Sequence, residues 1–135
     1  MDFAKTAYLE KKILNMVLLG ETYTPPATVY LALFTADPGR SGSLTNEIAD
    51  PEYARQEIAF TAADDDPASG SFSQNAYDVE FPEASEDWGT LTHVMIMDAL
   101  TGGNGLYRAE FSLAKIIAEG EFVKIPAGLG KIKED

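Results

Sequence analysis

The sequence predicts a mainly β protein: an antiparallel β-sandwich or small open barrel of six to eight short strands with one N-terminal α-helix. After Pro25-Pro26, short segments rich in aromatic and β-branched residues are separated by Gly, Pro, Asn, Asp and Ser clusters. No helical pattern interrupts these segments, which argues against a parallel α/β fold. A length of 135 residues is typical of one domain. We therefore expect one domain over residues 1–135, with the helix in 1–20 and the sandwich in 21–135.

The first predicted element is a helix over about residues 3–19, where apolar residues recur at helical spacing. Gly20 provides a left-handed cap, and Pro25-Pro26 prevents the helix from resuming. The apolar arc is wider than one small sheet face requires. It is expected to cover either the chain's own core or a second copy of the chain. The candidate contact residues on this segment are Phe3, Leu9, Ile13, Met16 and Val17.

The first predicted strand, residues 28–35 (TVYLALFT), is apolar on both of its alternating faces. This pattern is typical of a central strand covered on both sides. One cover is expected to be a second sheet, and the other a helix or a partner chain. Val29, Leu31 and Leu33 are therefore candidate residues for self-association.

The remaining strands follow from residue alternation and from turn residues. Residues 53–60 and 77–81 alternate apolar and polar side chains, so each has one exposed face. Residues 91–97 are apolar on both faces, and Thr101-Gly102-Gly103-Asn104-Gly105 supplies a tight reversal into a hairpin. Three more strands are expected at residues 106–113, 122–125 and 129–133. Two long loops are expected at residues 36–52 and 62–76.

Composition excludes several classes of function. Twenty-two acidic residues against ten basic ones give a formal charge of −12, which argues against binding to nucleic-acid phosphates. The chain has no cysteine and one histidine, so thiolate metal sites and thiol nucleophiles are excluded and a zinc or copper site is a poor match. The apolar run at residues 13–19 is shorter than the ~20 residues that cross a bilayer. Its flanks also differ from those of a secretory signal, so we expect a soluble, unprocessed protein without membrane insertion.

The sequence offers no catalytic constellation. His93 lies in a predicted apolar strand, where a hydrogen-bonded core or interface role is more typical than a general base. The common hydrolase, phosphate-loop and zincin motifs are missing from the sequence. We therefore expect no enzymatic activity, no cofactor and no metal centre.

Two further sites are candidates for contact with a partner. Asp64, Asp65 and Asp66 form an acidic cluster in a predicted loop. Calcium accepts several carboxylate oxygens, but the alternating spacing of a calcium loop is missing, and a solvated acidic loop is the alternative. Trp88 is expected either to pack against a sheet edge where a strand begins or to contact a partner.

Four segments carry a resemblance to a known family. They are YTPPATVYLAL at 23–33, FPEA at 81–84, DWGTLTH at 87–93 and DALTGGN at 98–104. In the same order along the chain they resemble small tailed-bacteriophage virion proteins, which are usually labelled tail fibre or minor structural proteins. The resemblance implies a non-enzymatic, β-rich component of the virion, assembled in the host cytoplasm.

Physical arguments favour one location on the particle. A compact chain without a sequence period does not suit a fibre shaft. On the outer capsid surface, small repeated contacts gain strength by avidity, and the shell separates a −12 protein from the packaged DNA. We therefore expect a capsid decoration protein that binds the major capsid protein and self-associates, with a trimer expected and a pentamer as the alternative. The other hypothesis is a tail fibre or tail-tip module that binds tail proteins and contacts a host receptor or glycan.

Overall fold

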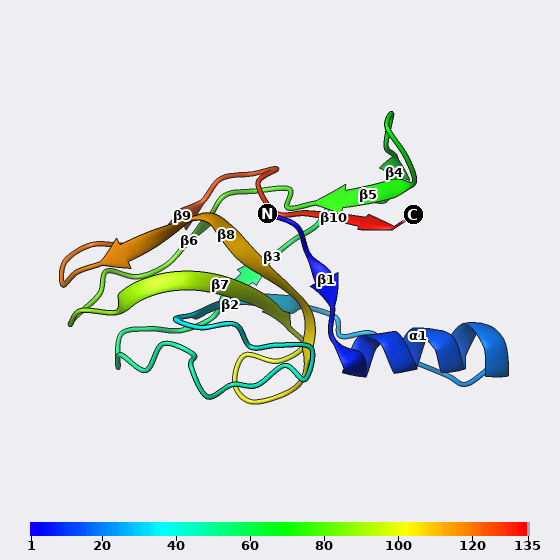
Figure 1. The fold of residues 1–135 in the computed structure, drawn as a ribbon, viewed down its shortest axis with the longest axis horizontal. Coiled ribbons are helices and arrows are strands. Elements are labelled where there is room, and N and C mark those ends of the chain that lie inside the picture. Colours follow the sequence, from blue (N-terminus) through cyan, green and yellow to red (C-terminus); the bar gives the residue numbers. More distant parts are fainter. Residues whose placement is uncertain (135) are drawn as a thin grey trace.

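The computed structural model describes residues 1–134 and has the predicted mainly β architecture with an N-terminal helix (Figure 1). The elements in chain order are β1 (Ala4–Lys5), α1 (Ala7–Leu19), β2 (Val29–Phe34), β3 (Gln56–Ile58), β4 (Asp64–Asp65), β5 (Ser71–Gln74), β6 (Val79–Glu80), β7 (Gly89–Met97), β8 (Gly105–Ile117), β9 (Lys124–Ile125) and β10 (Lys131–Glu134). All pairings between these strands are antiparallel. The predicted fold class is therefore confirmed.

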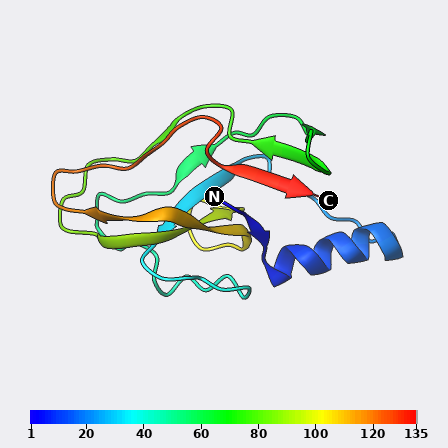
Figure 2. The ribbon, with the colours of Figure 1, turned by 45° about the horizontal axis from the view of Figure 1, so that its top comes forward.

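Three sheets form a sandwich-like arrangement. The largest has the strand order β1-β8-β7-β2-β3, and the smaller sheets are β10-β5-β4 and β6-β9. The two smaller sheets lie over one face of the large sheet (Figures 1 and 2). Val79 and Ile125 of the β6-β9 pair are buried in one cluster with Leu33 and Val94 of the large sheet. The main core therefore lies between the layers.

Strand β2 is covered on both faces by the chain itself. Leu31 and Leu33 lie in the main core, while Phe34 on the opposite face packs in a second cluster with Met95 and Met97. Leu44 of the 36–52 connection covers that second cluster. The apolar residues on both faces of β2 are therefore covered by other parts of the same chain.

The helix begins later than predicted, at residue 7. Ala4 and Lys5 pair with Arg108 and Tyr107 of β8, so the chain enters the helix from a strand. The Thr6 hydroxyl oxygen then accepts a hydrogen bond from the Leu9 amide at 3.4 Å, as an N-cap does. The predicted end is confirmed, because Gly20 has φ 70° and its amide donates to the carbonyl of Asn15. No helix within residues 1–134 has the length and apolar character needed to cross a membrane.

The predicted hairpin joins β7 to β8. Gly102 and Gly103 have positive φ angles of 60° and 72°, and the Asn104 amide donates to the Asp98 carboxylate at 2.7 Å. Farther from the turn, Leu91 of β7 pairs with Lys115 of β8, and His93 pairs with Glu110. One residue of β7 therefore lies opposite four residues of β8 between these pairs. The extra residues of β8 form a large bulge that carries Leu113 into solvent.

The prediction of one long loop over residues 62–76 is wrong. This segment contains β4 and β5, and β5 pairs with β10 near the end of the chain. Ser71, Ser73 and Gln74 give β5 little of the apolar alternation that marks a strand, and its partner is about 60 residues away in sequence. The other long connection, 36–52, contains only one isolated bridge, between Glu47 and Phe34.

Candidate functional site

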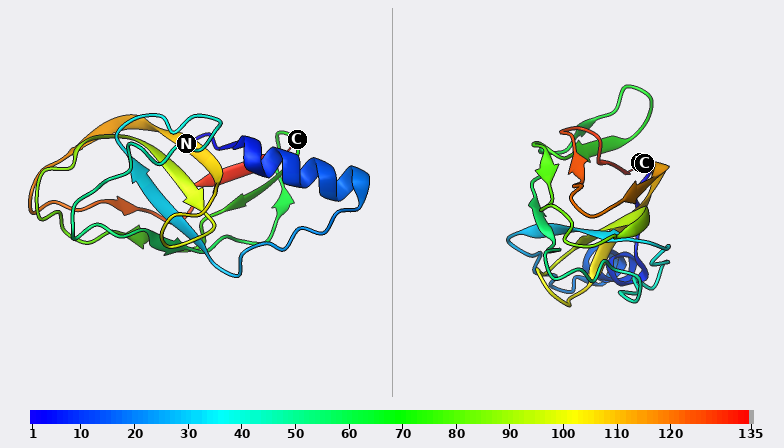
Figure 3. Two further views of the ribbon diagram at one scale, coloured as in Figure 1. Left: turned by 90° about the horizontal axis from the view of Figure 1, so that it is seen from below. Right: turned by 90° about the vertical axis from the view of Figure 1, so that its left-hand side faces the viewer.

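The C-terminal half of α1 projects from the body of the molecule (Figures 1 and 3). Leu9, in the first half, is buried in the core, and Ile13 still packs against it, but beyond Ile13 the helix leaves the sheets. The side chains of Leu14, Val17, Leu18 and Leu19 are in large part solvent-exposed, at 55, 68, 72 and 71%. Single exposed apolar residues are common on protein surfaces, whereas a contiguous group of this size marks an interaction site.

The exposed end of α1 is apolar on opposite sides. With 3.6 residues per turn, Leu14, Val17 and Leu18 lie on one side of the helix, and Met16 and Leu19 lie on the other. A surface helix has one apolar stripe, whereas a helix that is apolar all round is buried in proteins. The end of α1 therefore has the character of a segment that a partner surrounds.

The base of α1 is fixed to the body by polar contacts. Thr6 donates its hydroxyl to the carbonyl of Gly105 at 2.6 Å, and the Thr6 amide donates to the carbonyl of Leu106 at 2.9 Å. Arg40 donates its Nε hydrogen to Glu10 at 3.1 Å, and this ion pair holds the pKa of the Glu10 carboxyl below its usual range. These contacts set the direction in which the free end points.

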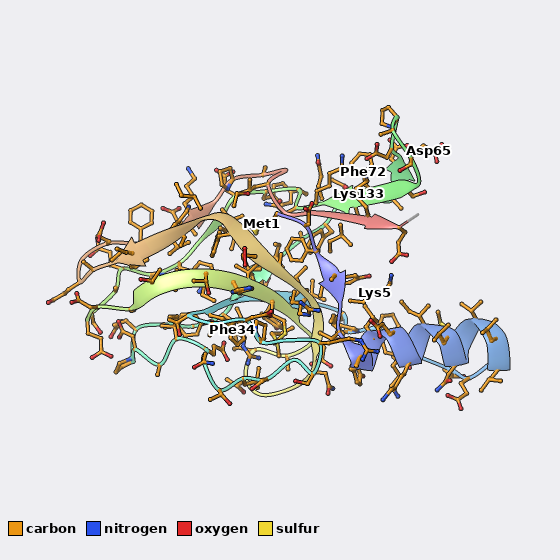
Figure 4. All side chains as sticks on the ribbon, in the orientation of Figure 1. Met1, Lys5, Phe34, Asp65, Phe72 and Lys133 are labelled. Atoms are coloured by element: carbon orange, nitrogen blue, oxygen red, sulfur yellow. The ribbon has the colours of Figure 1, made fainter. Side chains whose placement is uncertain are left out.

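An apolar cavity of about 250 Å³ lies between the large sheet and the β10-β5-β4 sheet. Its lining is mainly apolar and includes Val29, Phe60, Phe72, Ile96, Tyr107 and Ile132. Figure 4 labels Phe72 on β5 and Lys133 on β10, at the end of the molecule from which α1 projects. The cavity and the free helix end therefore lie at the same end of the folded molecule.

The acidic cluster is divided between two roles. Asp64 and Asp65 form the exposed strand β4, which pairs with β5 next to the cavity. Asp66 instead binds Lys131 Nζ at 3.1 Å and Lys133 Nζ at 3.3 Å. The Ala68 amide and these two lysines hold the pKa of the Asp66 carboxyl well below its usual range. Within residues 1–134, no group of three or more Asp, Glu or His side chains is arranged to hold a metal ion.

Trp88 is buried in the core, so it does not lie on the surface expected for partner contact. Its indole packs edge-on against Tyr53 and donates a hydrogen bond to Asp50 at 2.7 Å. Burial by itself raises the pKa of the Asp50 carboxyl, but hydrogen bonds from Ser85, the Glu52 amide and Trp88 outweigh it and hold this pKa well below its usual range. Trp88 immediately precedes β7, as the strand-opening alternative predicted.

His93 lies on β7 beside charged groups. Its Nδ1 is 2.8 Å from the Thr92 hydroxyl, and its Nε2 is 3.5 Å from a Glu110 carboxylate oxygen and 4.0 Å from one of Asp37. The hydroxyl beside it belongs to the preceding residue of the same strand. The His93 side chain is only 12% exposed, so this arrangement is a largely buried polar contact on the strand.

The structure separates the residues predicted for self-association into three groups. Leu9, Leu31 and Leu33 are buried in the chain's own core, so their side chains are not free for a partner; this corrects the expectation drawn from the apolar strand. Phe3, Ile13 and Val29 are half-buried, and Val29 lines the cavity. Met16 and Val17 are exposed on the free end of α1.

Other exposed residues were not predicted as contact sites. Leu113 and Ile116 are exposed on the far half of β8, and Phe122 follows them. The sequence alternation of β8 places Leu113 on the same face as Phe111, but the bulge breaks that alternation. No sequence signal identifies a bulge of this size.

The comparisons with known proteins point to one family. A search of curated proteins found no match. Residues 4–133, which include α1 and all the strands except the last residue of β10, match the family described as Podophage GP4 fiber I protein gp80. This match confirms the resemblance to tailed-phage virion proteins, and a family of structural fibre proteins is not typically enzymatic. The chain therefore belongs to this fibre-protein family and is a structural component of a phage virion.

Proposed function

We propose that the protein is a subunit of the phage tail fibre that assembles with copies of itself and with tail proteins, without catalysis. The observation that carries this proposal is the free, apolar end of α1 in a chain of this family. A chain that works alone gains nothing from exposing this group of leucines, because water contact is unfavourable for each of them. The matched family is described as a fibre protein, and this supports the tail rather than the head.

Capsid decoration is the second candidate. The compact body and the charge of −12 favour a position on the outer shell, where avidity strengthens small contacts. In either position the protein acts by mass action, because it stabilises whichever assembled state presents its binding surface.

The proposed assembly is a closed cyclic homo-oligomer, and we propose a trimer. Most soluble homo-oligomers have closed symmetry, and a closed ring leaves no copy of the apolar helix end exposed. Light scattering on the purified protein measures the copy number: three copies are expected, and five copies would replace the trimer with a pentamer.

The test is to locate the chain on the intact particle. A gold-labelled antibody against the chain, or a cryo-electron microscopy reconstruction of the virion, is expected to show it at the tail fibres. Labelling over the whole head would replace the fibre proposal with capsid decoration. A chain that is missing from purified virions would contradict both.

A further inference from the structure

We propose that the apolar end of α1 inserts into the apolar cavity of a second copy, between its large sheet and its β10-β5-β4 sheet. This inference rests on the proposed self-assembly and specifies its interface. Each copy then carries one donor segment, the helix end 14–19, and one acceptor site, the cavity.

The chemistry of the two surfaces matches. The helix end presents leucine, valine and methionine side chains, and the cavity is lined mainly by aliphatic and aromatic side chains such as Phe72, Ile96 and Ile132. A volume of about 250 Å³ is too small for a whole helix, but it accommodates one or two aliphatic side chains from a helix that lies across its mouth. Leu18 and Leu14, one turn apart on the same side, are the side chains placed to enter.

The chain's own helix does not fill its own cavity. Thr6 fixes the start of α1 to β8, and the helix runs away from the sheets so that its last turns contact solvent (Figures 1 and 3). The apolar end and the apolar cavity therefore both remain uncovered within one copy. A second copy supplies both missing partners at once.

Charge complementarity also favours a second copy. Within residues 1–134, seven of the ten basic side chains form ion pairs with acidic groups of the same chain, and Lys11 and Lys12 on α1 are among the three that do not. Lys11 lies on the same side of the helix as Leu14 and Leu18. Beside the cavity, the exposed strand β4 consists of Asp64 and Asp65. A helix seated in the cavity brings unpaired lysines toward unpaired aspartates.

Complementary variants test the proposal on the full chain. Leu18→Asp disables the donor, and Ala63→Trp blocks the acceptor, since Ala63 lines the cavity and is itself exposed. Light scattering after gel filtration is expected to show the wild type as an oligomer and each variant alone as a monomer. An equimolar mixture is expected to give a 1:1 heterodimer, because it contains one intact helix and one intact cavity. Assembly of Ala63→Trp like the wild type would overturn the proposal.

The matched control is Leu113→Asp, which makes the same change at a leucine 80% exposed on the β8 bulge. It is expected to leave the oligomer intact. Circular dichroism and urea unfolding of all three variants establish that each is folded. A Leu113→Asp chain that dissociates as fully as Leu18→Asp would also overturn the assignment to α1.

Disulfide trapping identifies the occupant directly. The chain has no cysteine, so Leu18→Cys and Ala63→Cys introduce the only thiols. When the two variants are mixed and oxidised, most of the cross-linked product is expected to join Leu18→Cys of one copy to Ala63→Cys of another. A product dominated by Leu18→Cys homodimers would indicate a helix bundle and overturn the proposal.

The results separate this inference from the proposed function. A specific cross-link together with labelling on the head would overturn the fibre role alone. Labelling on the fibre together with a helix bundle would overturn the interface alone. A wild-type chain that stays monomeric at high concentration would overturn the interface and the proposed self-assembly.

Discussion

Trp88 donates its indole hydrogen to a carboxylate oxygen of Asp50, with 2.7 Å between the heavy atoms, and both side chains are buried. The same carboxylate also accepts hydrogen bonds from the Ser85 hydroxyl and from the amides of Ser85 and Glu52. One buried anion thus joins the 36–52 connection to the segment that opens β7. A buried charge is tolerated only where hydrogen bonds replace its hydration, and here they do.

Asp50→Asn is expected to destabilise the protein, because the amide offers one acceptor oxygen where the carboxylate offered two charged ones. Its NH₂ group would also face the donors of Ser85 and Trp88. The midpoint of thermal unfolding is expected to fall by at least several degrees, and the fluorescence of Trp88, the single tryptophan, to shift to the red.

The control for this prediction is Asp65→Asn, which makes the same change on the exposed strand β4. It is expected to leave the melting midpoint nearly unchanged. Equal midpoints for the two variants would contradict the structural role of Asp50. Because assembly stabilises folded chains, this comparison and those below are made in the Leu18→Asp background.

Asp66 is expected to make the stability of the fold depend on pH in the acidic range. The Ala68 amide, Lys131 and Lys133 lower the pKa of its carboxyl below the ordinary value of 3.8 in the folded chain. The charged form is therefore favoured by folding, so its stabilisation is complete above the ordinary pKa and is lost as the pH falls below it. In melting curves between pH 7 and pH 2, the difference in melting midpoint between the Leu18→Asp chain and the same chain with Asp66→Asn is expected to shrink towards the acid end.

The control is Ser69→Ala in the same turn, which removes no titrating group. The difference in melting midpoint between this variant and the Leu18→Asp reference chain is expected to stay constant with pH. A pH-independent difference for Asp66→Asn would show that this carboxylate does not stabilise the fold by its charge.

Asn75 acts as a buried connector between the strand β5 and the turn before β10. Its side-chain NH₂ donates to the carbonyls of Tyr77 and Pro126, each at 3.0 Å, and its oxygen accepts from the Gly130 amide at 2.8 Å. Asn75→Ala leaves three backbone groups without these partners. We expect a loss of about 2–4 kcal/mol in the free energy of unfolding, measured with urea.

Asn46→Ala is the matched control, since Asn46 is exposed and its side chain makes no hydrogen bond within residues 1–134. It is expected to change the free energy of unfolding by less than about 0.5 kcal/mol. A small effect of Asn75→Ala would indicate that water replaces the lost partners.

Local patterns predicted the helix end, the hairpin and most strands because each depends on neighbouring residues. Gly20 ends α1 and Gly102 turns the hairpin through positive φ angles that favour glycine. The two buried faces of β2 also followed from its apolar residues. The segment that covers each face could not be predicted, because a second copy of the chain and the chain's own 36–52 connection would both require the same apolar pattern.

The features that sequence reasoning missed depend on distant partners. Thr6 caps the helix only because β8 receives the residues before it. Apart from the Glu52 amide, the donors that set Asp50 apart from twenty-one other acidic residues come from Ser85 and Trp88, more than 30 residues away. The candidate surface was predicted in part. Met16 and Val17 are exposed on α1, whereas the cavity requires a sheet pairing between β5 and β10 that no local pattern shows.

Thr6 links the stability of the fold to the direction of the helix. Its hydroxyl donates to the Gly105 carbonyl and its oxygen accepts from the Leu9 amide, so one buried group anchors α1 and caps it. Thr6→Val keeps the shape and removes both contacts. The free energy of unfolding is expected to fall by about 1–2 kcal/mol.

Without the Leu18→Asp change, Thr6→Val is also expected to weaken assembly several-fold in dilution experiments, because a loosely anchored helix loses more freedom when a neighbour binds it. Thr6→Ser keeps the hydroxyl and is expected to assemble at concentrations close to those of the wild type. A Thr6→Val chain that is less stable but assembles as tightly as Thr6→Ser would show that Thr6 does not help to position the helix for its neighbour. A residue that only caps the helix changes the free energy of unfolding, whereas a residue that also positions the helix changes the concentration at which the chain assembles.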